Sequence, residues 1–229
     1  MNNRKTNNQK VKNLVGVGIF AALAIVVSFA TQFIKIGYLS LDAGDIIIVL
    51  SSFIYGPISG VLISLVSSLV SFFYSGTGPW GLIMDFCSSA VFASVAAVIY
   101  KSKKTFTSAI IGIYAAVVAV TAVMMPLNIL ITPLYTPGVT REFVLREIPV
   151  MLLPFNFSKA LFNGGAVLLM YKPLVRALRK AGFVKGNSAD SATERPLGVG
   201  LTRTTLTATV VGGVSVLVAT VGLVLLAVL

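Results

Sequence analysis

Long apolar segments alternate with short polar ones along the whole chain, and this pattern predicts a series of membrane-spanning helices. A helix needs roughly 20 mostly apolar residues to cross a bilayer. The predicted spans cover residues 14–33, 46–55, 58–74, 81–100, 106–134 and 148–171, and a further apolar run covers residues 206–229.

Details of this pattern predict where the helices begin and break. The second span is short, Asp45 is placed to cap its start, and Gly56-Pro57 separates it from the third. Pro126 and Pro133 are expected to interrupt the fifth span.

Four segments result from this division of the chain. They are a basic cytoplasmic tail (residues 1–13), a six-helix membrane domain (14–180), a polar linker (181–205) and an extra C-terminal transmembrane helix (206–229). The predicted fold is therefore an all-α integral membrane protein.

The composition agrees with a membrane protein and removes several function classes. Of 229 residues, 56% are hydrophobic and 11% are charged, whereas soluble domains have about 25% charged residues. There is no histidine and only one cysteine, Cys87, which excludes an intrachain disulfide, a Cys/His zinc cluster and histidine acid–base catalysis. No GxxxxGK[ST] motif is present, so the chain has no nucleotide-binding loop and is not expected to be an enzyme.

The net charge of +11 is explained by topology and not by nucleic-acid binding. Basic residues gather on the cytoplasmic side of membrane proteins. With a cytoplasmic N-terminus, 14 of the 18 basic residues fall on that side: Arg4, Lys5, Lys10, Lys12, Lys101, Lys103, Lys104, Lys172, Arg176, Arg179, Lys180, Lys185, Arg195 and Arg203.

The sixth span carries the strongest polar signal inside an apolar segment. In LPFNFSKALFN (residues 153–163), helical spacing puts Asn156, Lys159 and Asn163 on one face. Intramembrane ionisable residues usually face a bundle interior or a cavity. Lys159 is therefore a candidate ligand-binding residue, and the alternative is a structural bond to carbonyls freed by the prolines of the fifth span.

Three other groups of residues have both a binding and a packing interpretation. Asn128 follows Pro126, and it could meet a polar ligand together with Asn156 or bond to Asn156 alone. Small residues at helical spacing occur on two faces and suit close helix packing, either within the chain or on a partner. They are Ser64, Ser67, Ser68 and Ser71 on the third span, and Gly18, Ala22, Ala24 and Ser28 on the first.

Three ordered stretches resemble one family. LDAGDIIIVLSSFIYGPISGVL, MPLNILITPLY and LPFNFSKALFN are similar to motifs of the riboflavin-binding substrate-capture (S) components of energy-coupling factor (ECF) importers, the RibU/FmnP subunits. The resemblance covers about residues 14 to 180. It implies a six-helix bundle that binds vitamin near its outer side, below the first loop, in the bacterial cell membrane.

The resemblance also implies site residues and partners. Asn128, Asn156 and Lys159 would face the flavin, and Asp85 is a further candidate for a ribityl hydroxyl. The first loop would add contacts from Gly37, Tyr38, Leu39 and Ala43. The implied cargo is riboflavin, with flavin mononucleotide as a further candidate. Energy would come from a transmembrane coupling protein and two ABC-type ATPases, and Gly18 and Ala22 would dock on the coupling protein.

Three alternatives stay open on the sequence alone. The first is an S component for another vitamin. A self-sufficient ion-coupled transporter is the second, although it would usually show paired repeats and membrane-embedded acids. The third is a membrane enzyme, which would need an acidic metal-binding cluster or a base.

Overall fold

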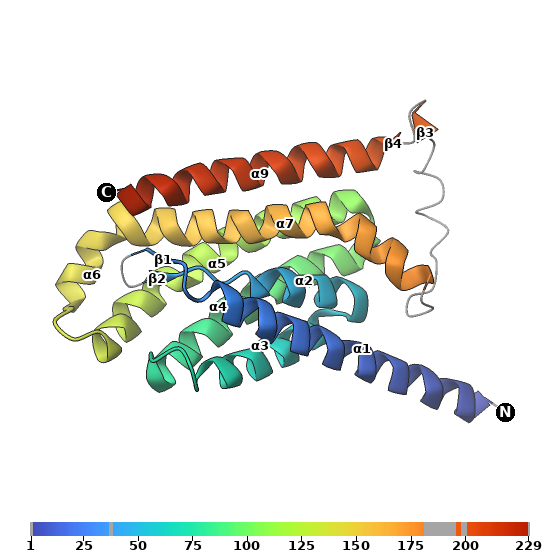
Figure 1. Ribbon diagram of the computed structural model, residues 1–229, viewed down its shortest axis with the longest axis horizontal. Helices are drawn as coiled ribbons and strands as arrows, with labels where there is room; N and C mark the ends of the chain where they lie inside the picture. Colours follow the sequence, from blue (N-terminus) through green and yellow to red (C-terminus); the bar gives the residue numbers. More distant parts are fainter. Residues whose placement is uncertain (1, 37–38, 181–195, 198–200, 229) are drawn as a thin grey trace.

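The computed structural model describes residues 2–36, 39–180, 196–197 and 201–228. It is a bundle of long helices that lie roughly side by side (Figure 1). The elements are α1 (Asn2–Thr31), β1 (Lys35–Ile36), β2 (Leu39–Ser40), α2 (Gly44–Tyr55), α3 (Pro57–Ser71), α4 (Gly78–Lys103), α5 (Phe106–Tyr135), α6 (Arg141–Glu147), the π-helical turn η1 (Ile148–Leu152), α7 (Leu153–Lys180), β3 (Pro196–Leu197), β4 (Leu201–Thr202) and α9 (Arg203–Val228).

The predicted spans are all helical, and their lengths differ. Helices α1, α4, α5 and α9 are long and apolar enough to cross a membrane, whereas α2 and α3 are shorter apolar helices. These two meet at Gly56, whose φ of 102° is a backbone conformation that favours glycine. Pro57 then starts α3 at the first-turn position, where its missing N–H costs nothing. The chain is a membrane protein made of helices, as predicted.

The predicted basic tail is helical, because α1 is continuous from Asn2. The part of α1 that is long and apolar enough to cross a membrane is Lys10–Thr31. No glycine or proline occurs before Gly16, so nothing in this stretch ends the helix.

The predicted interruption of the fifth span is wrong, because helix α5 continues through Pro126 and Pro133 without a break. Each proline removes only one backbone hydrogen bond, and a membrane offers the chain no water with which to replace the others. The irregular segment is instead η1, which precedes α7.

Small residues hold the centre of the bundle together. Ala96, Ala109 and Ala116 are buried on α4 and α5, which pack against each other, and Ala93 of α4 lies against Gly60 of α3. A Cβ atom built on Gly112 would lie 2.6 Å from the Ala96 carbonyl oxygen, so the two backbones touch. Close backbone approach of this kind is typical of helices packed in membranes.

The predicted extra helix is present as α9, and it packs along α7 on the opposite side of the bundle from α1 (Figure 1). Most of the predicted linker before it lies outside the described residues. Residues 196–197 and 201–202 of that linker pair as the short strands β3 and β4, and its last three residues already belong to α9.

Candidate functional site

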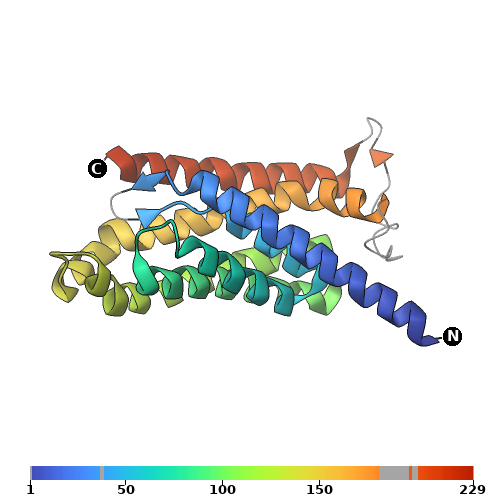
Figure 2. The same cartoon turned by 60° about the horizontal axis from the view of Figure 1, so that its bottom comes forward.

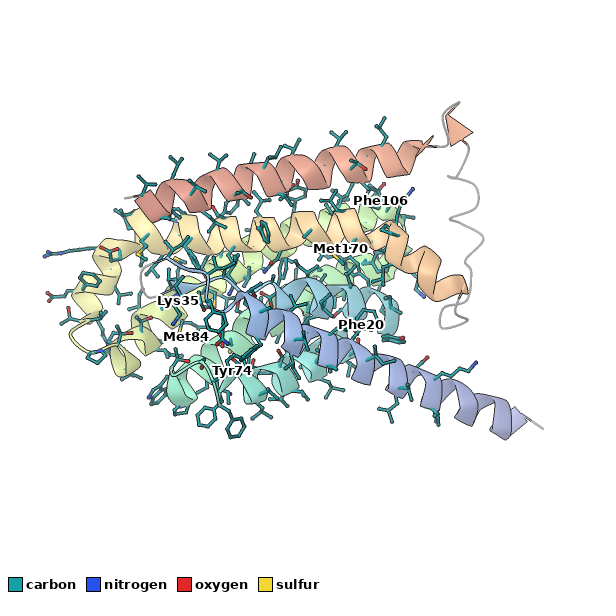
Figure 3. All side chains as sticks on the ribbon, in the orientation of Figure 1. Phe20, Lys35, Tyr74, Met84, Phe106 and Met170 are labelled. Carbon is teal, nitrogen blue, oxygen red and sulfur yellow. The ribbon has the colours of Figure 1, made fainter. Side chains whose placement is uncertain are left out.

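A cavity of about 230 Å³ lies at one end of the bundle. Its walls come from the end of α1, the hairpin of β1 and β2, the α3–α4 connection, and facing parts of α4, α5 and α7. Figure 3 shows Lys35, Tyr74 and Met84 together at this end, and Phe106 and Met170 far from them. The lining residues are Ser28, Gln32, Phe33, Lys35, Leu39, Ser40, Leu41, Asp42, Ser71, Tyr74, Ser75, Thr77, Gly81, Met84, Asp85, Ser88, Met124, Asn128, Phe155, Asn156 and Lys159.

The α7 stripe predicted from the sequence is divided between two roles. Asn156 and Lys159 line the cavity, but Asn163 does not. Asn156 Nδ2 donates to the carbonyl of Leu152, the last residue of η1, at 2.8 Å. An amide nitrogen has two N–H donors, so Asn156 keeps one of them, and its oxygen, for a ligand.

Lys159 is half-buried at the cavity wall. Among the described residues it has no hydrogen-bond or ion-pair partner, so the predicted structural bond to α5 carbonyls is not made. The carboxylates of Asp45 and Asp85 are near enough to interact with it electrostatically. An ammonium with three unused donors therefore faces the cavity.

Asn128 is fully buried on α5 and also lines the cavity. Its Nδ2 donates to the Met124 carbonyl at 2.7 Å, and its Oδ1 accepts from Thr132 Oγ1 at 3.1 Å. These bonds fix the plane of the amide. Since Asn128 and Asn156 each bond within their own chain segment, no hydrogen bond joins the pair in the described part of the chain.

Of the residues predicted in the first loop, the structure describes Leu39 and Ala43. Leu39 lines the cavity, while Gly37 and Tyr38 lie outside the described residues. Ala43 does not line the cavity. It is buried, and its N–H donates to Thr31 Oγ1 at 3.2 Å, so it joins the first loop to α1.

Asp45 does not cap α2 as predicted. The helix already begins at Gly44, so Asp45 lies inside it. Asp42 bonds to the helix start instead, since its Oδ1 accepts from the Gly44 N–H at 2.7 Å and from Ser28 Oγ at 2.7 Å. Asp45 is buried and accepts from Ser89 Oγ on α4.

Asn163 completes this buried anchor below the cavity. Its Nδ2 donates to the Asp42 carbonyl at 2.8 Å and lies 3.4 Å from Asp45 Oδ2. The anchor of Asp42, Asp45, Ser89 and Asn163 therefore joins the first loop to α2, α4 and α7. These contacts hold the walls of the cavity in place, although most of their members do not line it.

Asp85 lies on α4 and lines the cavity. Ser71 Oγ at the end of α3 lies 3.4 Å from its Oδ2, which is a long hydrogen bond. Ser64, Ser67 and Ser68 are buried on the same helix. The serine face thus packs against neighbouring helices and reaches the cavity only at its last residue.

The small residues of α1 fall into a buried pair and an exposed pair. Ala24 and Ser28 are buried, and a Cβ atom on Gly44 would lie 1.9 Å from Ser28 Oγ, so this pair packs within the chain. Gly18 and Ala22 are exposed, and nothing lies within 4 Å of a Cβ atom built on Gly18. These two are available to another helix.

Several lining residues are not predicted as site residues from the sequence. Ser28, Gln32, Tyr74 and Met84 come from the ends of α1 and α3 and the start of α4. None belongs to a polar stripe, and only the meeting of these ends makes them neighbours.

Comparison with known proteins decides the family. The family model described as "ECF transporter, substrate-specific component" matches residues 12–175. The chain belongs to this family. The chain is 30% identical to the riboflavin transporter RibU of Staphylococcus aureus (strain TCH60) over 184 residues, which covers 77% of this chain and 97% of that protein. It is 25% identical to the riboflavin transporter FmnP of Bacillus subtilis (strain 168) over 187 residues, covering 75% and 98%.

A solved structure agrees with this assignment. It is the S component of a bacterial ECF transporter, with a TM-score of 0.64 and 30% identity, and the match covers 74% of this chain and 99% of that one. The predicted family and fold class are confirmed. The family match ends at residue 175, so α9 lies beyond it.

Proposed function

We propose that this protein captures riboflavin and carries it across the bacterial plasma membrane as the substrate-specific subunit of an ECF importer. The observation that carries the proposal is one cavity that brings together Asn128, Asn156 and Lys159. The two relatives named above, both riboflavin transporters, support the choice of cargo. Flavin mononucleotide is a further candidate cargo.

The lining suits the chemistry of a flavin. Riboflavin has one polar edge of carbonyls and ring nitrogens, an apolar dimethylbenzene end and a hydroxylated tail. The two carboxamides and the ammonium can bond to the polar edge, while Leu39 and Phe155 cover the ring. Asp85 is the candidate acceptor for a ribityl hydroxyl.

In this proposal the chain binds its cargo and performs no catalysis. A transmembrane coupling protein and two ABC-type ATPases supply the energy. The distribution of basic residues favours a cytoplasmic N-terminus, which puts the cavity at the outer side of the membrane. Gly18 and Ala22 form the surface for the coupling protein, because they are small and uncovered.

The visible absorption spectrum of the protein, purified from cells grown with riboflavin, tests the cargo. We expect flavin bands at near-stoichiometric amount, and quenching of riboflavin fluorescence by the ligand-free protein. A colourless protein that does not quench riboflavin, but binds another vitamin, would replace riboflavin with that cargo.

Uptake measurements test the partners. Cells that contain this chain without coupling protein and ATPases should take up no riboflavin, whereas a self-sufficient ion-coupled transporter would need neither. The Gly18→Leu variant should bind riboflavin normally and lose uptake. Val224→Leu, at an exposed position on α9, is the control and should keep both.

A further inference from the structure

Helix α9 is joined tightly to the helix that carries Asn156 and Lys159. A Cβ atom on Gly212 would lie 2.8 Å from the Gly165 carbonyl oxygen, and one on Gly165 would lie 2.9 Å from the Gly212 carbonyl oxygen. The backbones of α7 and α9 therefore touch at this point. Tyr114 of α5 and Ser215 of α9 share a hydrogen bond of 2.8 Å, which sets the position of α9 along the bundle.

The C-terminal part of α9 reaches the back of the cavity wall. A Cβ atom on Gly222 would lie 2.7 Å from Ser158 Oγ. Ser158 is buried, directly precedes Lys159 in the sequence and does not line the cavity, so α9 contacts α7 next to the residue that presents the ammonium. α9 thus supports the turn of α7 that presents the ammonium.

The same end of α9 also packs under the first loop. Leu39, Val144, Leu152 and Phe155 form a buried set that we call the outer apolar cluster, and Leu223 and Leu226 of α9 pack against it together with Ile36 of β1. Leu39 and Phe155 line the cavity as well. Figure 2 shows the β1–β2 hairpin beside the C-terminal end of α9.

We propose that α9 is a positioning element of the binding site, which holds the β1–β2 hairpin and the start of α7 in the binding geometry and so slows release of the ligand. Walls that are fixed before binding lose less freedom when a ligand binds. Changes in such contacts act mainly on the dissociation rate. Since α9 lies beyond the family match, this is an addition of the present chain to the shared bundle.

The test compares leucines of one helix that differ in what they touch. The double variant Leu223→Ala and Leu226→Ala removes the contacts with the outer apolar cluster, and Leu225→Ala, at a position 61% exposed, is the matched control. The first readout is backbone hydrogen exchange of residues 39–43 in the ligand-free protein. We expect exchange to be about tenfold faster in the double variant and unchanged in the control. A double variant with Leu226→Met in place of Leu226→Ala should recover protection from exchange.

The second readout, the dissociation rate of riboflavin, rests on the proposed function. We expect it to rise about tenfold in the double variant, while the association rate stays within twofold. Wild-type protein that fails to bind riboflavin would remove the proposed cargo, and hydrogen exchange would still decide the role of α9. Unchanged exchange of residues 39–43 in a folded double variant would overturn that role.

A second pair of variants tests the same inference if the double variant does not fold. Gly212→Val should push α9 away from α7, because its side chain would meet the Gly165 carbonyl and Leu169. Gly213→Val is the control, since nothing lies within 4 Å of a Cβ atom at that position. Faster exchange of residues 39–43 in Gly212→Val alone supports the inference, and equal exchange in both variants contradicts it.

Discussion

The two ends of the bundle are built in opposite ways. At the cavity end, loops and helix ends surround a space lined by charged and amide side chains. At the other end, Phe53, Tyr100, Phe106 and Tyr171 pack ring against ring, with Phe53 and Tyr100 centroids 4.5 Å apart. The two tyrosine hydroxyls share a hydrogen bond of 2.6 Å.

This difference separates stability from binding along one set of helices. The aromatic end joins α2, α4, α5 and α7 through contacts that satisfy one another. At the cavity end, Lys159 interacts with Asp45 and Asp85 only electrostatically and makes no hydrogen bond or ion pair among the described residues, so its N–H donors are open to a ligand. We therefore expect substitutions at one end to change stability, and substitutions at the other to change affinity.

The largest expected effect is on stability, at the aromatic end. Phe53→Ala removes a buried ring from two aromatic contacts and should lower the free energy of unfolding by about 3 kcal/mol. Unfolding in a denaturing detergent measures this, and riboflavin affinity of the folded protein should stay within twofold. Phe73→Ala is the control, because Phe73 is 84% exposed. Equal stability of the two variants would contradict the division between the ends.

The second-largest expected effect is also on stability, at the anchor below the cavity. We expect Asn163→Ala to lower the free energy of unfolding by about 2 kcal/mol. The reason is that the part-buried Asp42 carbonyl loses its donor, and the Asp45 carboxylate keeps only the hydrogen bond from Ser89. Asn156→Ala is the matched comparison, as the same residue type on the same helix. The stability of the Asn156→Ala variant should change little, because Asn156 Nδ2 bonds only to the carbonyl of Leu152, four residues earlier. A reversed ranking in the same unfolding experiment would show that Asn163 is not part of the support.

The third effect is on affinity, at the cavity wall. Lys159→Ala and Asn156→Ala should each weaken riboflavin binding more than tenfold, about 1.4 kcal/mol, without unfolding the protein. Each removes donors that face the polar edge of the proposed ligand. Fluorescence titration measures the dissociation constant. Lys35→Ala is the control, since this exposed lysine lines the mouth and should matter less than Lys159.

A folded double variant of Lys159 and Asn156 with wild-type affinity would remove both residues from the proposed site. Loss of binding in Lys35→Ala but not in Lys159→Ala would move the polar edge of the ligand to the first loop.

The sequence predicted the helices and their order well because a bilayer leaves the backbone few alternatives to a helix. It predicted too strong an effect of Pro126 and Pro133, since the neighbouring turns of α5 keep their own hydrogen bonds. The π-helical turn η1 was not predicted, and no local pattern in its residues distinguishes it from an α-helix.

The candidate site could be predicted only in part. Helical spacing correctly put Asn156, Lys159 and Asn163 on one face, but it could not show that the cavity ends before Asn163. The carboxylate of Asp45 contacts Ser89 of α4 and Asn163 of α7, whereas that of Asp42 contacts Ser28 of α1, and this division is a property of the packed bundle. Residue type and spacing therefore found the polar groups, and packing divided them between binding and support.

The smallest expected effect lies where the two kinds of region meet, at the end of the serine face. Ser71→Ala removes a hydroxyl 3.4 Å from Asp85 Oδ2, and so long a bond should be worth only about 0.5 kcal/mol, or twofold in riboflavin affinity. Fluorescence titration resolves this if wild type and variant are measured side by side. Ser68→Ala, one turn earlier and buried among helices, should leave affinity unchanged. A tenfold loss in Ser71→Ala would instead mean that the hydroxyl itself contacts the ligand, and the binding region would then extend to α3.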